Sequence, residues 1–185
     1  MMSVSLDGFF EGPHGELDWQ LVDNELHGHF NDWLGQAGAF LDGRVTYELM
    51  ADYWPTADAD LASPPVVAKF ARIWRDMPKL VFSRTLRKAD WNATIVRDVV
   101  PSEIMKLKEE PGGDLVLGGA NLAASFRRQD LIDEYRFYVQ PVILGAGNPL
   151  SGRTGFPPSA STTRLRLAQT KTFGSGVVLL RYLRH

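Results

Sequence analysis

Leu117-Gly118-Gly119-Ala120-Asn121-Leu122 decides the fold, because here a short apolar run ends in two glycines and a helical pattern begins. Without Cβ atoms, the glycines let a phosphate approach the backbone, and the N–H groups at the helix start point towards it. A tight turn that needs glycine φ angles would use the same residues. The full G-x-G-x-x-G spacing is missing, so this is not an ordinary Rossmann fingerprint.

A second junction of this kind is Asp42-Gly43-Arg44-Val45-Thr46-Tyr47-Glu48. A glycine again leads from an expected strand into a helix, now with an arginine and a threonine in its first turn. A guanidinium and a hydroxyl suit phosphate oxygens. The alternative is a surface arginine beside a threonine that bonds its own backbone. Two such junctions, both after expected strands, are more specific than either one.

A third polar cluster follows another expected strand, in Leu80-Val81-Phe82-Ser83-Arg84-Thr85-Leu86-Arg87-Lys88. Open α/β sheets bind ligands beyond the carboxyl ends of their strands. A basic spot there could receive a 2′-phosphate, which favours NADP over NAD. A solvated loop is the other interpretation, and we prefer it for Arg87 and Lys88.

Short apolar runs alternate with helical patterns along the whole chain, which predicts one α/β domain over residues 1–185. Helices are expected after possible N-caps at Asp23, Ser63 and Ser102, and after both glycine junctions. The first of these helices presents Leu26, Phe30, Trp33 and Leu34 on one face, and the second Val67, Phe70, Ala71 and Trp74. Expected strands cover residues 1–6, 39–41, 79–83, 94–96, 114–117 and 134–142, with a hairpin at 165–172 and 177–182. Residues 145–163 predict a long surface loop.

Composition narrows the class of protein. The 185 residues are 44% hydrophobic and carry a formal net charge of −2, so a nucleic acid or an anionic membrane is not the expected partner. No cysteine is present, which removes disulfides and thiolate chemistry and fits a cytoplasmic protein. No apolar run is long enough for a membrane helix. His27 and His29 lie two residues apart and would face different sides of a helix, so no metal site is predicted.

Five motifs occur in a fixed order: Ser5-Leu6-Asp7-Gly8-Phe9, Gly43-Arg44-Val45-Thr46-Tyr47-Glu48, Phe82-Ser83-Arg84-Thr85-Leu86, Gly118-Gly119-Ala120-Asn121-Leu122 and Pro141-Val142-Ile143-Leu144-Gly145-Ala146-Gly147-Asn148-Pro149-Leu150. Together they resemble the dihydrofolate reductase-like family, which includes the C-terminal reductase domain of the bifunctional riboflavin-biosynthesis deaminase/reductase. The similarity spans nearly the whole chain and looks closest to stand-alone bacterial members. It implies a three-layer α/β/α fold with a mostly parallel central sheet and a C-terminal antiparallel hairpin.

The resemblance also implies a cofactor, NADP(H), and its contacts. In that family two glycine-led helix N-termini hold the diphosphate, a Ser-Arg-Thr strand end contacts the adenosine phosphate, and the first strand ends beside the nicotinamide. Carried over, the cofactor-binding residues are Ser5, Leu6, Gly8, Gly43, Arg44, Thr46, Ser83, Arg84, Thr85, Gly118, Gly119, Ala120, Asn121 and Leu122. Trp19 and Gln140 fall where the family lines its substrate pocket.

The chain also departs from the family. Dihydrofolate reductases carry a carboxylate on the first helix that helps protonate the pterin, and Asp23-Asn24-Glu25-Leu26-His27 offers no clear equivalent. We therefore do not expect dihydrofolate to be the substrate. A cationic set for a ribose phosphate is missing as well. The strand before Ser5 is expected to be short.

The predicted activity is reduction of a small pterin-, pyrimidine- or flavin-like heterocycle by NADP(H). Asp7 is the candidate catalytic residue, as proton donor or orienter, although an Asp-Gly turn would explain it and water could supply the proton. One alternative is a non-catalytic nucleotide- or drug-binding protein that uses the same pocket. Another is a plain α/β interaction domain whose glycines only make turns. The resemblance makes a homodimer plausible.

Overall fold

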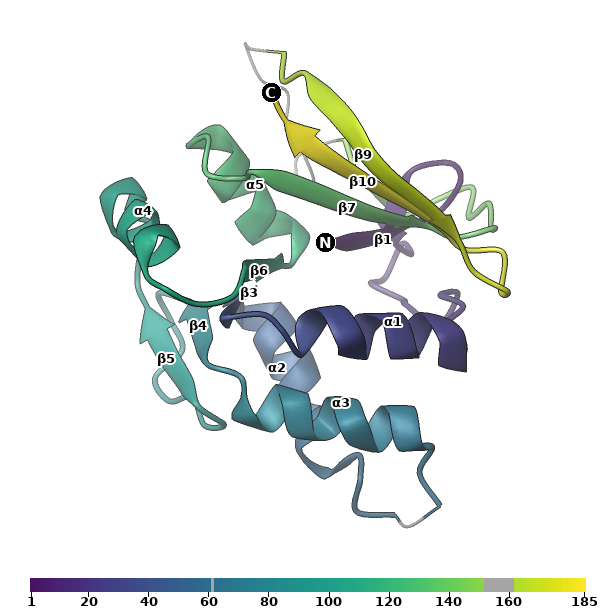
Figure 1. Cartoon of the computed structure of the whole chain (residues 1–185), viewed down its shortest axis with the longest axis horizontal. Coiled ribbons are helices and arrows are strands. Elements are labelled where there is room, and N and C mark those ends of the chain that lie inside the picture. The colour runs from purple at the N-terminus through teal and green to yellow at the C-terminus, as the bar shows by residue number, and fades with distance from the viewer. Residues whose placement is uncertain (61, 152–161) are drawn as a thin grey trace. The chain divides into compact units, whose positions relative to one another are not determined.

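The computed structural model describes residues 1–60, 62–151 and 162–185 of the chain. Its internal contacts divide these residues into two compact units. Unit 2 is Asn24–Leu122, and unit 1 combines Met1–Asp23 with Ala123–His185. The single domain predicted from the sequence stays a prediction. Each unit is described by itself below (Figure 1).

Unit 2 is built on a four-stranded, fully parallel sheet with the order β5-β4-β3-β6. The strands are β3 (Ala39–Gly43), β4 (Lys79–Phe82), β5 (Ala93–Val96) and β6 (Leu115–Gly118). β3 lies in the middle and is buried along residues 39–42. This burial explains why its sequence is an apolar run rather than an alternating pattern.

Four α-helices begin in unit 2 before β6 ends: α1 (Asn24–Leu34), α2 (Arg44–Tyr53), α3 (Pro65–Asp76) and α4 (Pro101–Glu109). A short 3-10 helix, η1 (Trp54–Thr56), follows α2. Figure 1 shows α1 and α3 running side by side, and they pack together. The predicted inward faces are largely confirmed, since Leu26, Leu34, Phe70, Ala71 and Trp74 are buried.

Two predicted caps are wrong. Helix α3 has Pro64 as its N-cap and α4 has Val100, and neither cap makes a side-chain hydrogen bond. Ser63 lies one residue before the cap and donates its hydroxyl to the carbonyl of Ala57 (2.8 Å). Ser102 follows Pro101 and is already inside the first turn. In both helices a proline occupies the first helical position, so the helix begins at the proline and the serine is not the N-cap.

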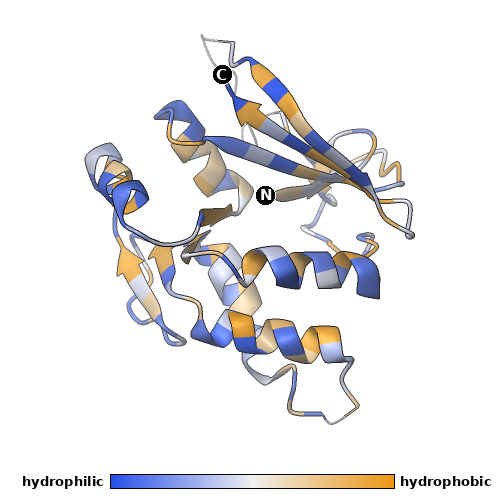
Figure 2. Ribbon diagram, in the orientation of Figure 1, coloured by the Kyte–Doolittle hydropathy of each residue, from blue (hydrophilic) through white to orange (hydrophobic). Residues whose placement is uncertain are grey.

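Unit 1 holds a second four-stranded sheet with the order β1-β7-β10-β9. Its strands are β1 (Met2–Val4), β7 (Glu134–Val139), β10 (Val178–Arg184) and β9 (Leu165–Thr172). β1 pairs in parallel with β7, and the other pairs are antiparallel. Apolar residues of β9 fall in its first half, Leu165–Ala168, and its second half is polar (Figure 2). The β9–β10 hairpin was predicted, and so was the α/β fold with a parallel sheet and this C-terminal hairpin; both are confirmed.

Three further elements complete the described chain. β2 (Phe9–Glu11) pairs antiparallel with β8 (Asn148–Pro149), so part of the predicted 145–163 loop forms a small ladder, while residues 152–161 of that loop lie outside the described residues. Helix α5 (Ala120–Arg128) starts in unit 2 with residues 120–122 and continues in unit 1. Across the described ranges, no helix is long and apolar enough to cross a bilayer.

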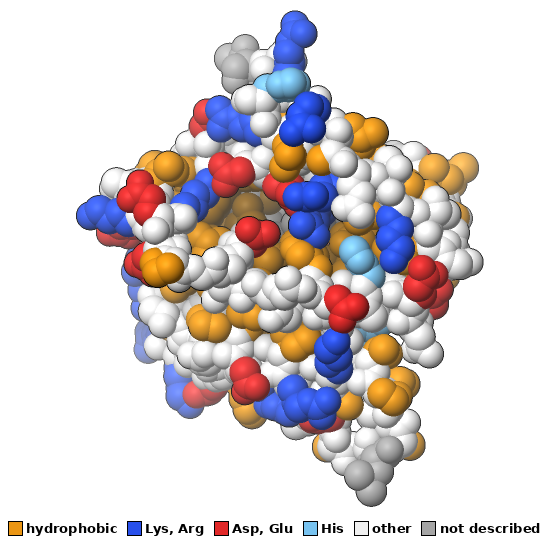
Figure 3. Space-filling model, in the orientation of Figure 1, with side chains coloured by type: hydrophobic (Ala, Val, Ile, Leu, Met, Phe, Trp, Pro, Cys, Tyr) orange, Lys and Arg blue, Asp and Glu red, His pale blue; other side chains and the backbone are white. Residues whose placement is uncertain are grey.

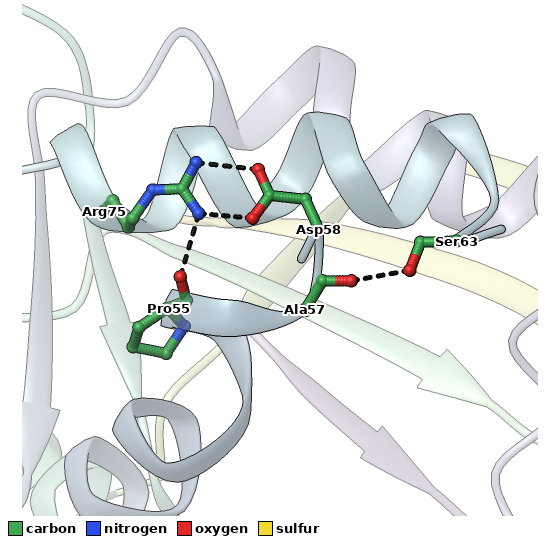
Figure 4. A network of polar contacts seen from close by, with 5 residues as sticks. All are labelled: Pro55, Ala57, Asp58, Ser63 and Arg75. Atoms are coloured by element: carbon green, nitrogen blue, oxygen red, sulfur yellow. Dashed lines mark hydrogen bonds and ion pairs between the residues drawn. The ribbon is translucent and has the colours of Figure 1, made fainter. Parts of the chain in front are cut away.

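Arg75, near the end of α3, holds the segment that follows η1 (Figure 4). Its guanidinium donates to both carboxylate oxygens of Asp58 (2.7 and 2.8 Å) and to the carbonyl of Pro55 (2.9 Å). These bonds hold the pKa of Asp58 below its usual value. Both side chains are about a quarter exposed, at 26% and 22%. Such a bidentate pair fixes geometry better than a single exposed contact does.

We predict that Arg75→Ala lowers the melting temperature more than Lys69→Ala does. Lys69 also pairs across helices, with Asp32, but both side chains of that pair are at least half exposed, where ion pairs contribute little. Because the pKa of Asp58 is lowered in the folded protein, the Arg75 contribution is present at neutral pH and disappears as the pH falls through that lowered pKa. Calorimetry at pH 7 and at pH 3 measures this. Equal losses for the two variants at pH 7 would contradict it.

Candidate functional site

The two glycine-led turns lie next to each other in unit 2. β3 and β6 are hydrogen-bonded parallel neighbours, with Asp42 opposite Gly118 in the register. β3 runs directly into α2 at Gly43, and Gly119 alone separates β6 from α5. Both helices therefore begin at the same edge of the sheet, from adjacent strand ends. The sequence predicted each turn, and the register shows that they are adjacent.

The turns touch closely enough that glycine is required. A Cβ on Gly118 would overlap Oδ1 of Asp42. Gly119 has φ +86°, and a Cβ there would stand 2.5 Å from the hydroxyl oxygen of Thr46. These contacts give the tight-turn interpretation a physical basis, and the phosphate interpretation stays a prediction.

The N-terminus of α2 has no capping side chain. Its N-cap is Gly43, which has no side chain, and no side-chain cap bond forms there among the described residues. Neither α2 nor α5 has an acidic residue in its first turn. Backbone N–H groups at such a helix start attract anions, and the helix dipole adds to this.

Arg44 and Thr46 lie in the first turn of α2, as predicted, but with partners of their own. Arg44 donates to Glu48 one turn further on (2.6 Å), and both side chains are 45% exposed. A phosphate at Arg44 would compete with Glu48 at little cost, since an exposed pair of this kind is weak. The hydroxyl of Thr46 faces Gly119 in the other turn.

The third cluster ends β4, the other neighbour of β3. Phe82 lies opposite Gly43 in the parallel register, so the ends of β4, β3 and β6 form a row. Ser83 is buried, and its hydroxyl oxygen accepts from the amides of Thr85 (3.3 Å) and Leu86 (2.9 Å). The side chain of Ser83 therefore shapes this turn.

Charged partners around this turn were missed in the sequence. Arg84 is 81% exposed and pairs with Asp98. Arg97 donates to the carbonyls of Ser83 (2.8 Å) and Leu86 (2.7 Å) and so braces the loop. Thr85 is exposed. Arg97 and Asp98 follow β5, and only the pairing of β5 with β4 brings them here.

Asp42 and Lys79 are the buried charges of unit 2. Burial raises the pKa of Asp42 to about 7, although the positive charge of Lys79 opposes the shift. Burial likewise lowers the pKa of Lys79 to about 8. The ammonium of Lys79 donates to the carbonyls of Met77 and Trp91 (2.8 Å each) and lies 4.2 Å from the ring centre of Trp74.

In unit 1, Asp7 connects residues 5–8 to a distant segment. Its carboxylate accepts from the hydroxyl of Ser5 (2.6 Å) and from the amides of Leu144 (3.1 Å) and Gly145 (2.7 Å). The Ser5 bond is the main cause of a lowered pKa for Asp7. Gly8, at φ +84°, closes the turn by donating to the carbonyl of Ser5 (3.0 Å). An ionised carboxylate with three donors can orient its neighbours but holds no proton to give at neutral pH.

The two predicted substrate residues have structural partners in unit 1. The indole of Trp19 donates to the carbonyl of Glu16 (2.9 Å). Gln140 is fully buried, and its carbonyl oxygen accepts from the amide of Leu21 (2.9 Å). Leu6, the remaining residue of the 5–8 turn, is exposed. Among the residues that the structure describes, no group of three His, Asp or Glu could hold a metal ion.

Comparisons with known proteins agree with this architecture. The uncharacterized protein YyaP of Bacillus subtilis (strain 168) is 36% identical over 182 residues, which cover 98% of this chain and 91% of that protein. The uncharacterized protein YwjB of the same strain is 30% identical, with coverage of 96% and 92%.

Solved structures share the fold. A putative riboflavin biosynthesis protein from Shewanella sp. PV-4 aligns with a TM-score of 0.74 at 21% identity, covering 100% of this chain and 96% of the other. RibD of Acinetobacter baumannii aligns with a TM-score of 0.67 at 18% identity, and there the chain spans 56% of the longer protein. The sequence matches the RibD C-terminal domain family over residues 1–179. The chain therefore belongs to the RibD C-terminal domain family, as its motifs indicated.

Proposed function

We propose that the protein is an NADP(H)-dependent reductase of a small pterin-, pyrimidine- or flavin-like heterocycle. Membership of the RibD C-terminal domain family supports a reductase, because that domain is the reductase part of riboflavin biosynthesis. One observation carries the cofactor proposal: two glycine-led helix starts lie side by side at the ends of β3 and β6.

A dinucleotide diphosphate fits this pair of turns. It carries two negative charges on a short bridge, and each helix start presents N–H groups and the positive end of a helix dipole. Beside the backbone of Gly118 and Gly119 stand Oδ1 of Asp42 and the hydroxyl of Thr46, and we propose that the diphosphate contacts this backbone next to them. In the proposed complex, one side of the diphosphate contacts Gly43, Arg44 and Thr46. The other side contacts residues 118–122.

The preference for NADP(H) over NAD(H) rests on the end of β4. Arg84 is the exposed cation of that turn, and its present partner, Asp98, is exposed as well. A 2′-phosphate would bind a guanidinium through two parallel hydrogen bonds. We propose that this phosphate replaces Asp98 as the partner of Arg84. Ser83 and Thr85 belong to the same turn and would help to bind the phosphate.

The bound cofactor would supply the hydride, and the protein would supply position and a proton path. We propose that Asp7 orients residues 5–8 and that water delivers the proton, since the lowered pKa of Asp7 keeps its carboxyl ionised. Contacts of Ser5, Leu6 and Gly8 with the cofactor, and of Trp19 and Gln140 with substrate, remain proposals from the family resemblance.

The proposed partners are a small heterocyclic substrate and, by family resemblance, a second copy of the chain. Positive and negative side chains are interspersed on the face drawn in Figure 3, which fits the net charge of −2 and gives no basic stripe on that face for nucleic acid. A cytoplasmic location is part of the same proposal, since this is a bacterial metabolic domain.

We predict that the protein binds NADPH and that Gly119→Val weakens binding at least tenfold. Valine at φ +86° is strained and would meet the hydroxyl of Thr46. The control is Gly28→Ala, at a helical glycine with nothing within 4 Å of the added Cβ. Fluorescence titration gives both affinities. Unchanged affinity in Gly119→Val would contradict a diphosphate between the turns.

Candidate heterocycles are then added to the same samples, and oxidation of NADPH is followed by its loss of absorbance. Turnover supports a reductase. Tight binding without turnover of any pterin, pyrimidine or flavin would point instead to a nucleotide- or drug-binding protein. A folded protein that binds no dinucleotide would contradict both.

We predict tighter binding of NADPH than of NADH, and a loss of this difference in Arg84→Ala. Because Arg84 is highly exposed, its removal should leave the fold intact, and Arg87→Ala in the same loop serves as the control. The expected preference is about tenfold or more, the usual size of one charge-assisted contact. Equal affinity for the two cofactors in the unaltered protein would overturn the 2′-phosphate assignment.

We predict that Asp7→Ala speeds amide hydrogen exchange at Leu144 and Gly145 and slows turnover. The variant removes the acceptor that both amides use. Glu16→Ala is the control, because Glu16 accepts a backbone amide, that of His14, in another loop of unit 1. Faster exchange with undiminished turnover would remove Asp7 from the mechanism.

A further inference from the structure

A buried carboxyl lies beneath the two glycine turns. Asp42 is the residue of β3 before Gly43, and it is only 6% exposed. It stands opposite Gly118 in the strand register, and its Oδ1 would clash with a Cβ on Gly118. A carboxyl in this position is next to both backbone turns that the proposed function assigns to the diphosphate.

A negative charge here would oppose the ligand. Two like charges a few ångströms apart repel strongly where water is excluded, so a carboxylate beside a diphosphate disfavours binding. A protonated carboxyl removes this repulsion and can donate a hydrogen bond. The proposed site should therefore bind a diphosphate more tightly when Asp42 is protonated than when it is ionised.

The charged groups near Asp42 do not remove the repulsion between an ionised Asp42 and the diphosphate. The charged groups on the elements of unit 2 packed against it are Lys79 on β4, and Arg44, Glu48 and Asp52 on α2; the positive charge of the N-terminus also opposes the rise in the pKa of Asp42. Arg44 is engaged by Glu48, and Lys79 by two carbonyls. β6 and residues 120–122 carry no charged side chain. Even with Lys79 nearby, burial keeps the pKa of Asp42 about 7.

We propose that Asp42 controls dinucleotide affinity: its carboxyl is uncharged when the diphosphate is bound, so that binding at neutral and higher pH takes up a proton. This inference rests on the proposed function. It makes Asp42 a positioning residue of the cofactor site, acting through charge beneath the turns rather than through contact with the reacting atoms.

Affinity for NADPH measured from pH 5.5 to 8.5 tests the proposal. Below pH 6, Asp42 should be mainly neutral in the free protein, because burial raises its pKa to about 7, and Asp42→Asn should match the unaltered protein within about twofold. Above pH 7 the affinity of the unaltered protein should fall by up to tenfold per pH unit relative to Asp42→Asn. Titration of the ligand's own phosphate affects both proteins equally and cancels in the ratio. Asp114→Asn, an exposed carboxylate just before β6, is the control and should follow the unaltered protein.

Two results would overturn the proposal: the same pH dependence in Asp42→Asn as in the unaltered protein, or weaker binding by Asp42→Asn at every pH. A second measurement needs no variant. Calorimetry of NADPH binding at pH 8, in buffers of different ionisation enthalpy, should show uptake approaching one proton, because the 2′-phosphate is already fully ionised there. Binding without uptake rejects this inference and leaves the proposed function standing. Absence of NADPH binding at all pH values, in a folded protein, rejects both.

Discussion

The close contact between the Gly118-Gly119 turn and the β3–α2 turn is the constraint on which the site depends. The parallel register sets Asp42 against Gly118, and the positive φ of Gly119 leads the chain into α5 past Thr46. A side chain at either glycine would have to displace the carboxylate of Asp42 or the hydroxyl of Thr46. At the same place, α2 and α5 begin from adjacent strand ends. Packing accounts for both glycines, and the proposed anion binding would use the same residues.

Much of the fold could be predicted from local pattern. Apolar runs of strand length, helical spacing in residues 24–34 and 65–76, and glycine at the strand ends marked most elements within a few residues. The predicted strand at residues 134–142 was too long, because β7 ends at Val139. The cap assignments failed for a local reason: proline fixes φ in the first turn and sets the helix boundary, whatever hydroxyl lies nearby.

The site was predictable only as separate pieces. Each glycine junction was visible in sequence, but their adjacency depends on β3 pairing with β6, some 75 residues along the chain. Asp98 as partner of Arg84, and the amides of Leu144 and Gly145 as partners of Asp7, also come from distant segments. Asp42 reads as an ordinary polar residue before a glycine. Its burial between two neighbouring strands is what gives it an unusual pKa.

Backbone amide NMR during NADPH titration tests the central claim most directly, since it observes the two turns separately. Binding of one diphosphate between them predicts that the amides of Arg44 and Val45 in one turn, and of Gly119 and Ala120 in the other, shift together with one common dissociation constant. Saturable shifts in only one of the two turns, with the other unchanged, would contradict the account.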